Sequence, residues 1–518
     1  MKKITPLLVL LLLIQTSYSQ VTPDWIFQNN PAYNFAPTTN VMRAGSNTYI
    51  CAQSIDADNS AYIFKLDNTG NILYEDSIHG FDYSALDHKR MVMDTNGSVY
   101  LCGTILDTLG YSKIRIIKYD STLTRLADIV YVDSLHVDYS PKGLLYSSTE
   151  NKIYCLGFRF DGNVRLIAIK FDDDLNFIRE AADTVNPYIT VTAYDIDNQG
   201  NIILGGYGFT FGTGEDLILS KLDTAGNVAW YIYEDGSSHS DDALMDLAID
   251  NFNNIYVAGR FDDSIPNKVM KFNPLGVKAW TSHLDEIFLP KVAVDAAGAL
   301  YVTGFDTVPE HEAVLYKFDS LGNLVGATFT DIPDYVAYSS DYFVSIQTDD
   351  SANVYLLNNA DSALERKWFI AKFDSSLSNI FTIVYPHNIP NPSVSSSLCL
   401  IDDGFLVAGS VNNFSELRLV QFHETIPTGI HETQTINSFT VYPNPSTGEI
   451  KIKSSKTESE NILLEIYNVN GSLVMTRQLL SGIQHSASVD IKTLPPGVYV
   501  LRAYSGSSHY SFWITKAD

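Results

Sequence analysis

Acidic, histidine and tyrosine residues cluster in the polar stretches that separate the apolar segments of this sequence. Carboxylates can coordinate a divalent cation, tyrosine rings can stack on a sugar, and two carboxylates together can hydrolyse a glycosidic bond. The candidate ligand-binding residues are Asp82, Tyr83, Asp87, His88, His136, Tyr139, His239, Asp241, Asp242, His311, Tyr335 and Tyr342. The same stretches contain Asp138, Glu310, Glu312, Asp334 and Asp341. These residues are candidates for a binding surface. Loops are also polar for solvation alone, so the residues do not identify a ligand.

Sequence signatures of catalysis, metal binding or cofactor binding are missing from the chain. We find no nucleophile elbow, phosphate-binding loop, His-Glu-x-x-His or dinucleotide fingerprint. The stretch 195–200 begins like an EF-hand but lacks the twelve-residue loop and its terminal glutamate, so we expect a hairpin turn there. We therefore predict no catalytic residue, no metal and no cofactor. Catalysis stays open as an alternative, because repeat folds can assemble a site from scattered loops.

The elements that would position these residues repeat along the chain. An apolar strand is followed by a second strand that ends in Lys-aromatic-Asp or a close variant, at a spacing of about fifty residues. The lysines of the copies are Lys65, Lys118, Lys170, Lys221, Lys271, Lys317 and Lys372, and Gln421 holds the eighth place. Short strands at this period predict an all-β fold with an eight-bladed β-propeller over residues 20–425, or a seven-bladed one if a weak copy is an insertion.

Each copy can be divided into four strands. In the fourth copy we expect them at 190–195, 202–206, 217–222 and 228–233, with Asp-x-x-Gly-Asn turns after the first and the third. The eighth copy lacks an outer strand, whereas Trp25-Ile26-Phe27 resembles the outer strands at Trp230 and Trp280. We therefore predict that residues 25–27 complete the last blade and close the ring. Because the lysines recur in every blade, we expect them to be structural and to pair with neighbouring turns.

These motifs resemble the propeller repeats of secreted bacterial proteins, written Asp-x-x-Gly-Asn-x-Tyr-x-x-Gly followed by Lys-Phe-Asp-x-x-Gly-Asn. The turns 223–230 and 273–280 are also similar to quinoprotein-type propeller repeats. This second likeness implies no quinone cofactor, because the metal-ligating residues expected beside one are missing.

The N-terminus and the charge indicate an exported protein that does not bind nucleic acid. Lys2 and Lys3 precede the apolar run 7–14, and small residues follow, which predicts a signal peptide over 1–19. No other stretch is long enough for a transmembrane segment. The formal net charge is −26, and since charges balance after residue 426, the acidic excess belongs to the repeats and repels phosphate backbones.

The four cysteines are expected to be buried free thiols. Cys51, Cys102 and Cys155 occupy the same strand of successive copies, and Cys399 lies in an apolar run of the eighth. Equivalent strands of neighbouring blades do not generally hold their side chains within disulfide reach.

After a linker at 426–436, a new short-strand region begins, and residues 437–518 are predicted to form a small Ig-like β-sandwich. Its corner motifs consist of Tyr442, Pro443, Asn444, Pro445 and Gly448, then Leu494, Pro495, Gly497 and Tyr499. These motifs resemble the type A C-terminal sorting domain of the type IX (Por) secretion system of Bacteroidota. The resemblance implies recognition by that machinery, localisation outside the cell or on the outer-membrane surface, and removal of the tail with release or attachment to surface lipopolysaccharide.

Together these features predict a secreted or cell-surface, non-enzymatic β-propeller that binds an extracellular glycan or protein. The alternative is a propeller-type polysaccharide hydrolase or lyase that uses carboxylates of the loop face.

Overall fold

A computed structural model gives an all-β fold, as predicted, with 39 strands among the residues that the structure describes. The structure describes residues 21, 23–28, 35–54, 60–83, 89–132, 136–162, 164–182, 189–210, 214–236, 239, 241–261, 267–284, 287–306, 313–330, 345–361, 366–385, 394–411, 416–424, 439–442, 446–454, 462–468, 473–479, 487–505 and 508–517. The chain divides into two compact units, Met1–Thr425 and Ile426–Asp518. Across the described ranges, no helix is long and apolar enough to cross a membrane.

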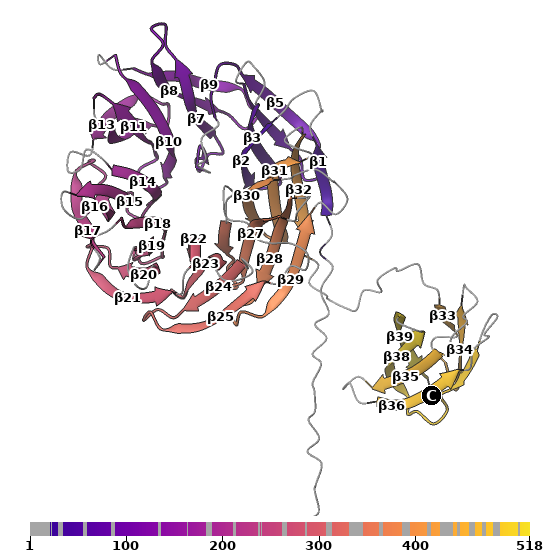
Figure 1. Cartoon of the computed structure of the whole chain (residues 1–518). Coiled ribbons are helices and arrows are strands. Elements are labelled where there is room, and N and C mark those ends of the chain that lie inside the picture. The colour runs from indigo at the N-terminus through magenta and orange to yellow at the C-terminus, as the bar shows by residue number, and fades with distance from the viewer. Residues whose placement is uncertain are drawn as a thin grey trace, which may run out of the picture. The chain divides into compact units, whose positions relative to one another are not determined.

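The first unit is a ring of four-stranded antiparallel sheets, each made mostly of consecutive strands (Figure 1). The first sheet contains β2 (Phe35–Ala44), β3 (Asn47–Ser54), β4 (Ala61–Leu66) and β5 (Ile72–Ile78), and the second contains β6 (Met91–Met93), β7 (Val99–Leu106), β8 (Ser112–Tyr119) and β9 (Arg125–Tyr131). The third sheet contains β10 (Asp138–Ser147), β11 (Lys152–Phe160), β12 (Val164–Asp172) and β13 (Phe177–Ala182). The fourth contains β14 (Ile189–Ile196), β15 (Ile202–Thr210), β16 (Gly214–Leu222) and β17 (Val228–Glu234). The predicted strands of the fourth copy are therefore confirmed.

The remaining sheets continue the same order around the ring. They are β18 (Ala243–Ile249), β19 (Ile255–Arg260), β20 (Asn267–Phe272) and β21 (Lys278–Leu284); β22 (Ile287–Val294), β23 (Leu300–Asp306), β24 (Ala313–Phe318) and β25 (Leu324–Thr330); β26 (Ser345–Thr348), β27 (Val354–Asp361), β28 (Arg366–Phe373) and β29 (Asn379–Tyr385); and β30 (Val394–Ile401), β31 (Gly404–Val411) and β32 (Glu416–His423), joined by β1 (Pro23–Gln28).

The ring is closed by its own N-terminal strand. β1 pairs antiparallel with β32, so that Trp25 lies opposite Gln421 and Phe27 lies opposite Leu419. The Gln421 side chain also donates to Asp24 Oδ2 at 3.3 Å. This pairing confirms the predicted closure and satisfies the backbone groups of an otherwise open sheet edge.

Hairpin turns are built by an aspartate that bonds its own backbone. In the turn after β4, Asp67 Oδ1 accepts the N–H groups of Thr69 and Asn71 at 2.8 and 2.9 Å, and Gly70 takes a left-handed φ of 83°. In the equivalent turn after β8, Leu123 adopts a φ of 55° in place of the glycine. The Asp-x-x-Gly pattern is thus a backbone requirement that a buried leucine can also meet.

Neighbouring sheets are joined by the recurring lysines. Lys65 Nζ donates to the Ser121 carbonyl at 2.6 Å and Lys170 Nζ to the Thr224 carbonyl at 2.9 Å, in each case in a turn of the next sheet. These contacts confirm that the repeated lysines are structural. Tryptophans add a second joint, since a Cβ on Gly276 would lie 2.9 Å from the Trp230 ring of the preceding sheet.

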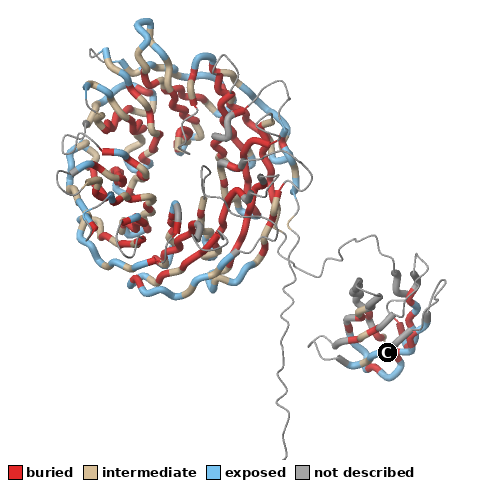
Figure 2. Tube along the Cα trace, in the orientation of Figure 1, coloured by how far each residue is buried: buried red, intermediate tan, exposed pale blue. Residues whose placement is uncertain are grey.

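The core lies between the faces of adjacent sheets. One apolar cluster, for example, combines Tyr49 and Ile63 of one sheet with Leu101 and Ile117 of the next. Figure 2 shows buried residues along the inner strands and exposed ones along the outer strands. The cysteines are free thiols, and Cys51, Cys102 and Cys155 are buried as predicted, whereas Cys399 is partly exposed.

The second unit consists of two antiparallel sheets around one small core. A three-stranded sheet contains β33 (Phe439–Tyr442), β34 (Glu449–Ser454) and β37 (Ala487–Asp490), and a four-stranded sheet contains β35 (Ile462–Asn468), β36 (Leu473–Leu479), β38 (Gly497–Ser505) and β39 (Ser508–Lys516). Ile450 and Val489 of the first sheet pack in the same cluster as Leu464, Leu501 and Ile514 of the second.

Candidate functional site

The predicted binding residues fall into three groups in the structure. Asp82, Tyr83, His136, Tyr139, His239, Asp241 and Asp242 lie in described segments. Asp87, His88, His311, Tyr335 and Tyr342 lie outside the described residues, as do Glu310, Glu312, Asp334 and Asp341. Of the described set, the structure brings together His239, Asp241 and Asp242, which all lie in the segment between β17 and β18.

Two of the predicted tyrosines are core residues. Tyr83 is 2% exposed, its hydroxyl donates to Asn40, and its N–H donates to Gln53 Oε1 at 2.6 Å. Tyr139 is fully buried and packs edge-to-face on Tyr131. Neither ring offers a face to a ligand, so their positions do not support the predicted contact. Tyr139 lies within the first strand of its sheet, β10, and Tyr83 follows the isolated bridge between Asp82 and Thr104.

Two further predicted residues lie apart from this group. The Asp82 backbone forms an isolated β-bridge with Thr104, and its N–H donates to the Thr104 carbonyl at 2.9 Å. His136 is exposed and stacks on Tyr111 with ring centroids 6.3 Å apart. Among the described residues, neither is part of a cluster that could surround a ligand.

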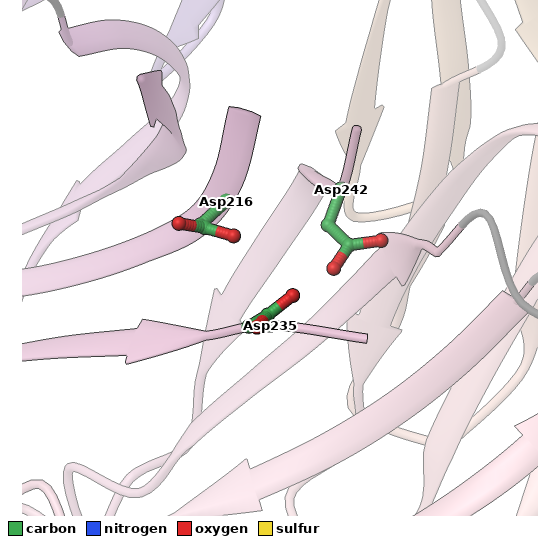
Figure 3. Close-up of side chains that lie close together, drawn as sticks. All are labelled: Asp216, Asp235 and Asp242. Carbon is green, nitrogen blue, oxygen red and sulfur yellow. The ribbon is translucent and has the colours of Figure 1, made fainter. Parts of the chain in front are cut away.

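Three carboxylates meet where β16 begins, β17 ends and the chain enters β18. Asp216, Asp235 and Asp242 each place an oxygen within 4.8 Å of the others, and Figure 3 shows the three side chains turned toward a common point. Asp216 and Asp242 are buried, whereas Asp235 is exposed. Three oxygens at this spacing could coordinate a divalent cation.

The register of the sheet produces this convergence. Leu217 pairs with Glu234 across β16 and β17, so the next step of the ladder brings Asp216 and Asp235 opposite each other. Like charges directly opposite on two strands are destabilising. On its other side Asp216 faces Gly208, whose missing side chain leaves space beside the carboxylate.

Backbone hydrogen bonds hold the neighbouring segment against β16. The Asp242 N–H donates to the Glu215 carbonyl at 2.6 Å, and the Glu215 N–H donates to Asp241 Oδ1 at 3.1 Å. The Asp242 carboxylate accepts the Gly236 N–H. His239, in a left-handed conformation with φ of 53°, contacts Asp235 through Nδ1 at 2.6 Å. The carboxylates of Asp235, Asp241 and Asp242 therefore help to hold this segment in place.

A cavity of about 240 Å³ opens beside this group, between the sheets that begin with β14, β18 and β22. Its polar lining comes from Tyr207, Glu215, Asp241, Asp242 and Arg260, and its apolar wall consists of Ala243, Met245, Ile287, Leu289 and Pro290. Burial and the nearby Asp241 charge raise the pKa of the Glu215 carboxyl. An aromatic ring, one cation and several acceptors around an apolar floor are groups that can hold a polyhydroxylated ligand.

Sequence reasoning missed Tyr207, Glu215, Asp216, Asp235 and Arg260 at this place. The signal for the acids was present, since Gly214-Glu215-Asp216 begins the third strand of the fourth sheet and Asp235 follows its outer strand directly. Only the register shows that these ends meet.

The corner residues of the second unit support its core. Leu494 and Tyr499 are 7% and 6% exposed, and the Tyr499 hydroxyl donates to the Pro495 carbonyl at 2.7 Å. A Cβ on Gly448 would lie 2.7 Å from Lys492 Cγ. Tyr442 ends β33, and Pro443, Asn444 and Pro445 lie outside the described residues.

Comparison with solved structures finds chains of low sequence identity that match a large part of this chain. The β-propeller domain of the trilobed protease from Pyrococcus furiosus is 11% identical, with a TM-score of 0.39 over 69% of this chain and 98% of that one. A PL25 ulvan lyase is 11% identical, with a TM-score of 0.44 over 77% and 96%. The BP39L lectin from Burkholderia pseudomallei is 10% identical, with a TM-score of 0.43 over 68% and 100%. No curated protein matches the chain.

The second unit, in contrast, matches a defined family. Residues 440–515 match the secretion system C-terminal sorting domain, which agrees with the resemblance seen in its corner motifs. Such a tail interacts with the type IX secretion machinery and indicates export to the cell surface or beyond. The match over these residues therefore supports sorting of the chain by the type IX secretion system.

Proposed function

We propose that the protein is a non-enzymatic ligand-binding β-propeller of eight blades that its sorting domain carries to the cell surface or the medium. The eight four-stranded sheets of the first unit support the blade count, each sheet being one blade. We take residues 1–19 to be a cleaved signal peptide and the second unit to be Ig-like. Removal of the tail, with release or attachment to surface lipopolysaccharide, completes the proposed route.

The observation that carries the binding function is the cavity beside Tyr207 and Arg260. It lies at the ends of strands where three blades meet, a position at which loops can vary while the sheets hold them in place. Tyr207 can stack on the apolar face of a sugar ring, and Glu215 and Arg260 can bond its hydroxyl groups. We therefore propose an extracellular glycan as the ligand.

A glycan array tests this proposal with the mature full-length chain and two variants. Tyr207→Ala removes the stacking ring, and we expect binding to weaken by about tenfold or more. Phe160→Ala is the matched control, because Phe160 is an exposed aromatic residue near the end of the equivalent strand, β11, in the preceding blade. Equal binding by wild type and Tyr207→Ala would move the ligand away from this cavity.

One observation favours the alternative, a polysaccharide hydrolase or lyase. Burial and the neighbouring Asp241 raise the pKa of Glu215, and a raised carboxyl pKa is the direction that a general acid requires. The same array, incubated and then examined for released oligosaccharides, distinguishes the two functions. Product release by wild type that Glu215→Gln abolishes would establish catalysis and overturn the binding proposal.

A further inference from the structure

We propose that the centre of the ring is a second binding site, which takes a carboxylate or sulfate group carried by a small hydroxylated molecule. A cavity of about 340 Å³ lies among the inner strands and is lined by strand residues of six of the eight sheets and by Lys89, which precedes β6. The groups that matter are Lys89, Tyr194, Asp246, Lys291, Gln347 and Ser397. The proposal does not depend on the glycan site at the loops.

The cavity is less acidic than the protein as a whole. The chain carries a formal net charge of −26, yet the cavity is lined by two ammonium groups, of Lys89 and Lys291, and by one described carboxylate, of Asp246. A polyanion would be repelled by the whole surface. A small molecule with one anionic group meets less repulsion at a place where two ammonium groups balance the carboxylates of Asp195 and Asp246.

Lys89 is held in place by residues two sheets away. Its Nζ donates to the Tyr194 carbonyl at 2.8 Å, lies 3.3 Å from Asp195 Oδ1 and sits 5.4 Å from the centre of the Tyr194 ring. The Tyr194 ring fits because Gly143 lies against it, where a Cβ would be 1.9 Å from the hydroxyl oxygen. The Lys89 side chain remains 44% exposed, and an ammonium has three donors, so it can also bond an anion.

Lys291 reaches the same cavity from β22. Its Nζ lies 3.7 Å from Asp246 Oδ1, while Asp246 Oδ2 accepts the Val292 N–H at 3.0 Å. At this long distance the ion pair between Lys291 and Asp246 is weak, and the Lys291 side chain is 32% exposed. An incoming carboxylate could therefore bond Lys291 without displacing a strong partner.

The wall of the cavity is preformed. Hydrogen bonds tie each inner strand to the next around this part of the ring, and they join Thr192 to Leu244, Asp246 to Val292, Val294 to Thr348, Leu398 to Gln347, and Ser397 to Val41. A wall fixed in this way loses little conformational freedom when a ligand binds. Hydroxyl and amide groups of Ser397 and Gln347 face the lysines across the same lining and suit a hydroxylated molecule.

Isothermal titration calorimetry of the mature full-length protein at low ionic strength tests the proposal with sodium glucuronate, glucose and sodium sulfate as probes. We expect glucuronate to bind at least about tenfold more tightly than glucose, because only glucuronate offers a charge to the lysines. Lys291→Met should weaken glucuronate binding by about tenfold or more without changing the melting temperature. Competition by sulfate would support an oxyanion site, and binding of glucuronate alone would assign it to carboxylates.

Two control variants locate the effect. Lys278→Met removes the same charge from an outer strand, where Lys278 pairs with Glu234 at 2.7 Å, and should leave glucuronate affinity unchanged. Tyr207→Ala should also leave it unchanged, because Tyr207 belongs to the other cavity. The proposal is overturned if glucose binds as tightly as glucuronate, if Lys291→Met binds like wild type, or if neither glucuronate nor sulfate binds.

Discussion

The carboxylate group of Asp216, Asp235 and Asp242 should lower the stability of the protein, and Asp216→Asn should raise it. The variant keeps the shape of the side chain and removes its charge. The three oxygens lie within 4.8 Å of one another, and two unit charges at that distance repel by about 3.5 kcal/mol at an effective dielectric constant of about 20. Asp235 is exposed, so solvent screens its share. We therefore expect a net gain of about 1 to 2 kcal/mol in the free energy of unfolding.

Differential scanning fluorimetry at neutral pH, low salt and with EDTA measures this gain, because the chelator removes cations that would mask the repulsion. The melting temperature of Asp216→Asn should rise by about 2 °C or more, and the rise should shrink at high salt. Asp128→Asn serves as the opposite case, since Asp128 pairs with Arg115 at 2.7 Å and its loss should lower the melting temperature. A melting temperature of Asp216→Asn at or below wild type in EDTA would refute the repulsion argument.

Three other predictions concern the scaffold. Gly276→Ala should destabilise the protein by about 2 kcal/mol or more, because Gly276 has a φ of 79° and its added Cβ would lie 2.9 Å from Trp230. Gly110→Ala should cost only the backbone strain, because Gly110 has a φ of 87° and open space around the added Cβ. Urea unfolding of the two variants compares these costs. Burial raises the pKa of the Cys51 thiol, and a hydrogen bond with Cys102 together with burial raises the pKa of the Cys155 thiol. Both thiols should therefore react with a thiol reagent only after denaturant is added, and rapid labelling of the native protein would contradict this. Hydrogen bonds from Thr69 and Asn71 lower the pKa of Asp67 to about 2. The stabilising effect of the Asp67 carboxylate should therefore be complete above the unfolded pKa of about 3.9 and disappear as the pH falls to about 2. Asp67→Asn should flatten that part of a plot of melting temperature against pH, and an unchanged slope would show that the turn does not contribute.

Most of the fold could be predicted from the repeat, because every blade packs against its neighbours in the same way and therefore needs similar residues at equivalent positions. The lysine before each Asp turn and the glycine or leucine that follows recur for local reasons, and these patterns predicted strand positions closely. Trp25 was recognisable as part of the closing strand because it repeats the outer-strand pattern of Trp230 and Trp280.

The candidate sites were harder to predict, since each depends on how sheets meet. Asp216 and Asp235 converge through a ladder register that the period does not encode. Lys89 reaches Tyr194 only because Gly143 leaves space between them. Tyr83 and Tyr139 were predicted to lie in the loops of the binding face, yet both side chains are buried, because polar neighbours in the sequence do not show which way a single side chain points.

The closure of the ring by β1 also determines when folding can finish. Gln28 bonds Glu416 across 388 residues of chain at 2.7 Å, so this contact belongs to the slowest class of loop closures. During N-to-C synthesis and transport, seven sheets can form from neighbouring strands, but the eighth waits for its last strand to arrive. The unfinished ring has an unpaired strand at each end throughout that time. The final registration of β1 on β32 is thus the step that completes the eighth sheet and links the first strand of the ring to its last.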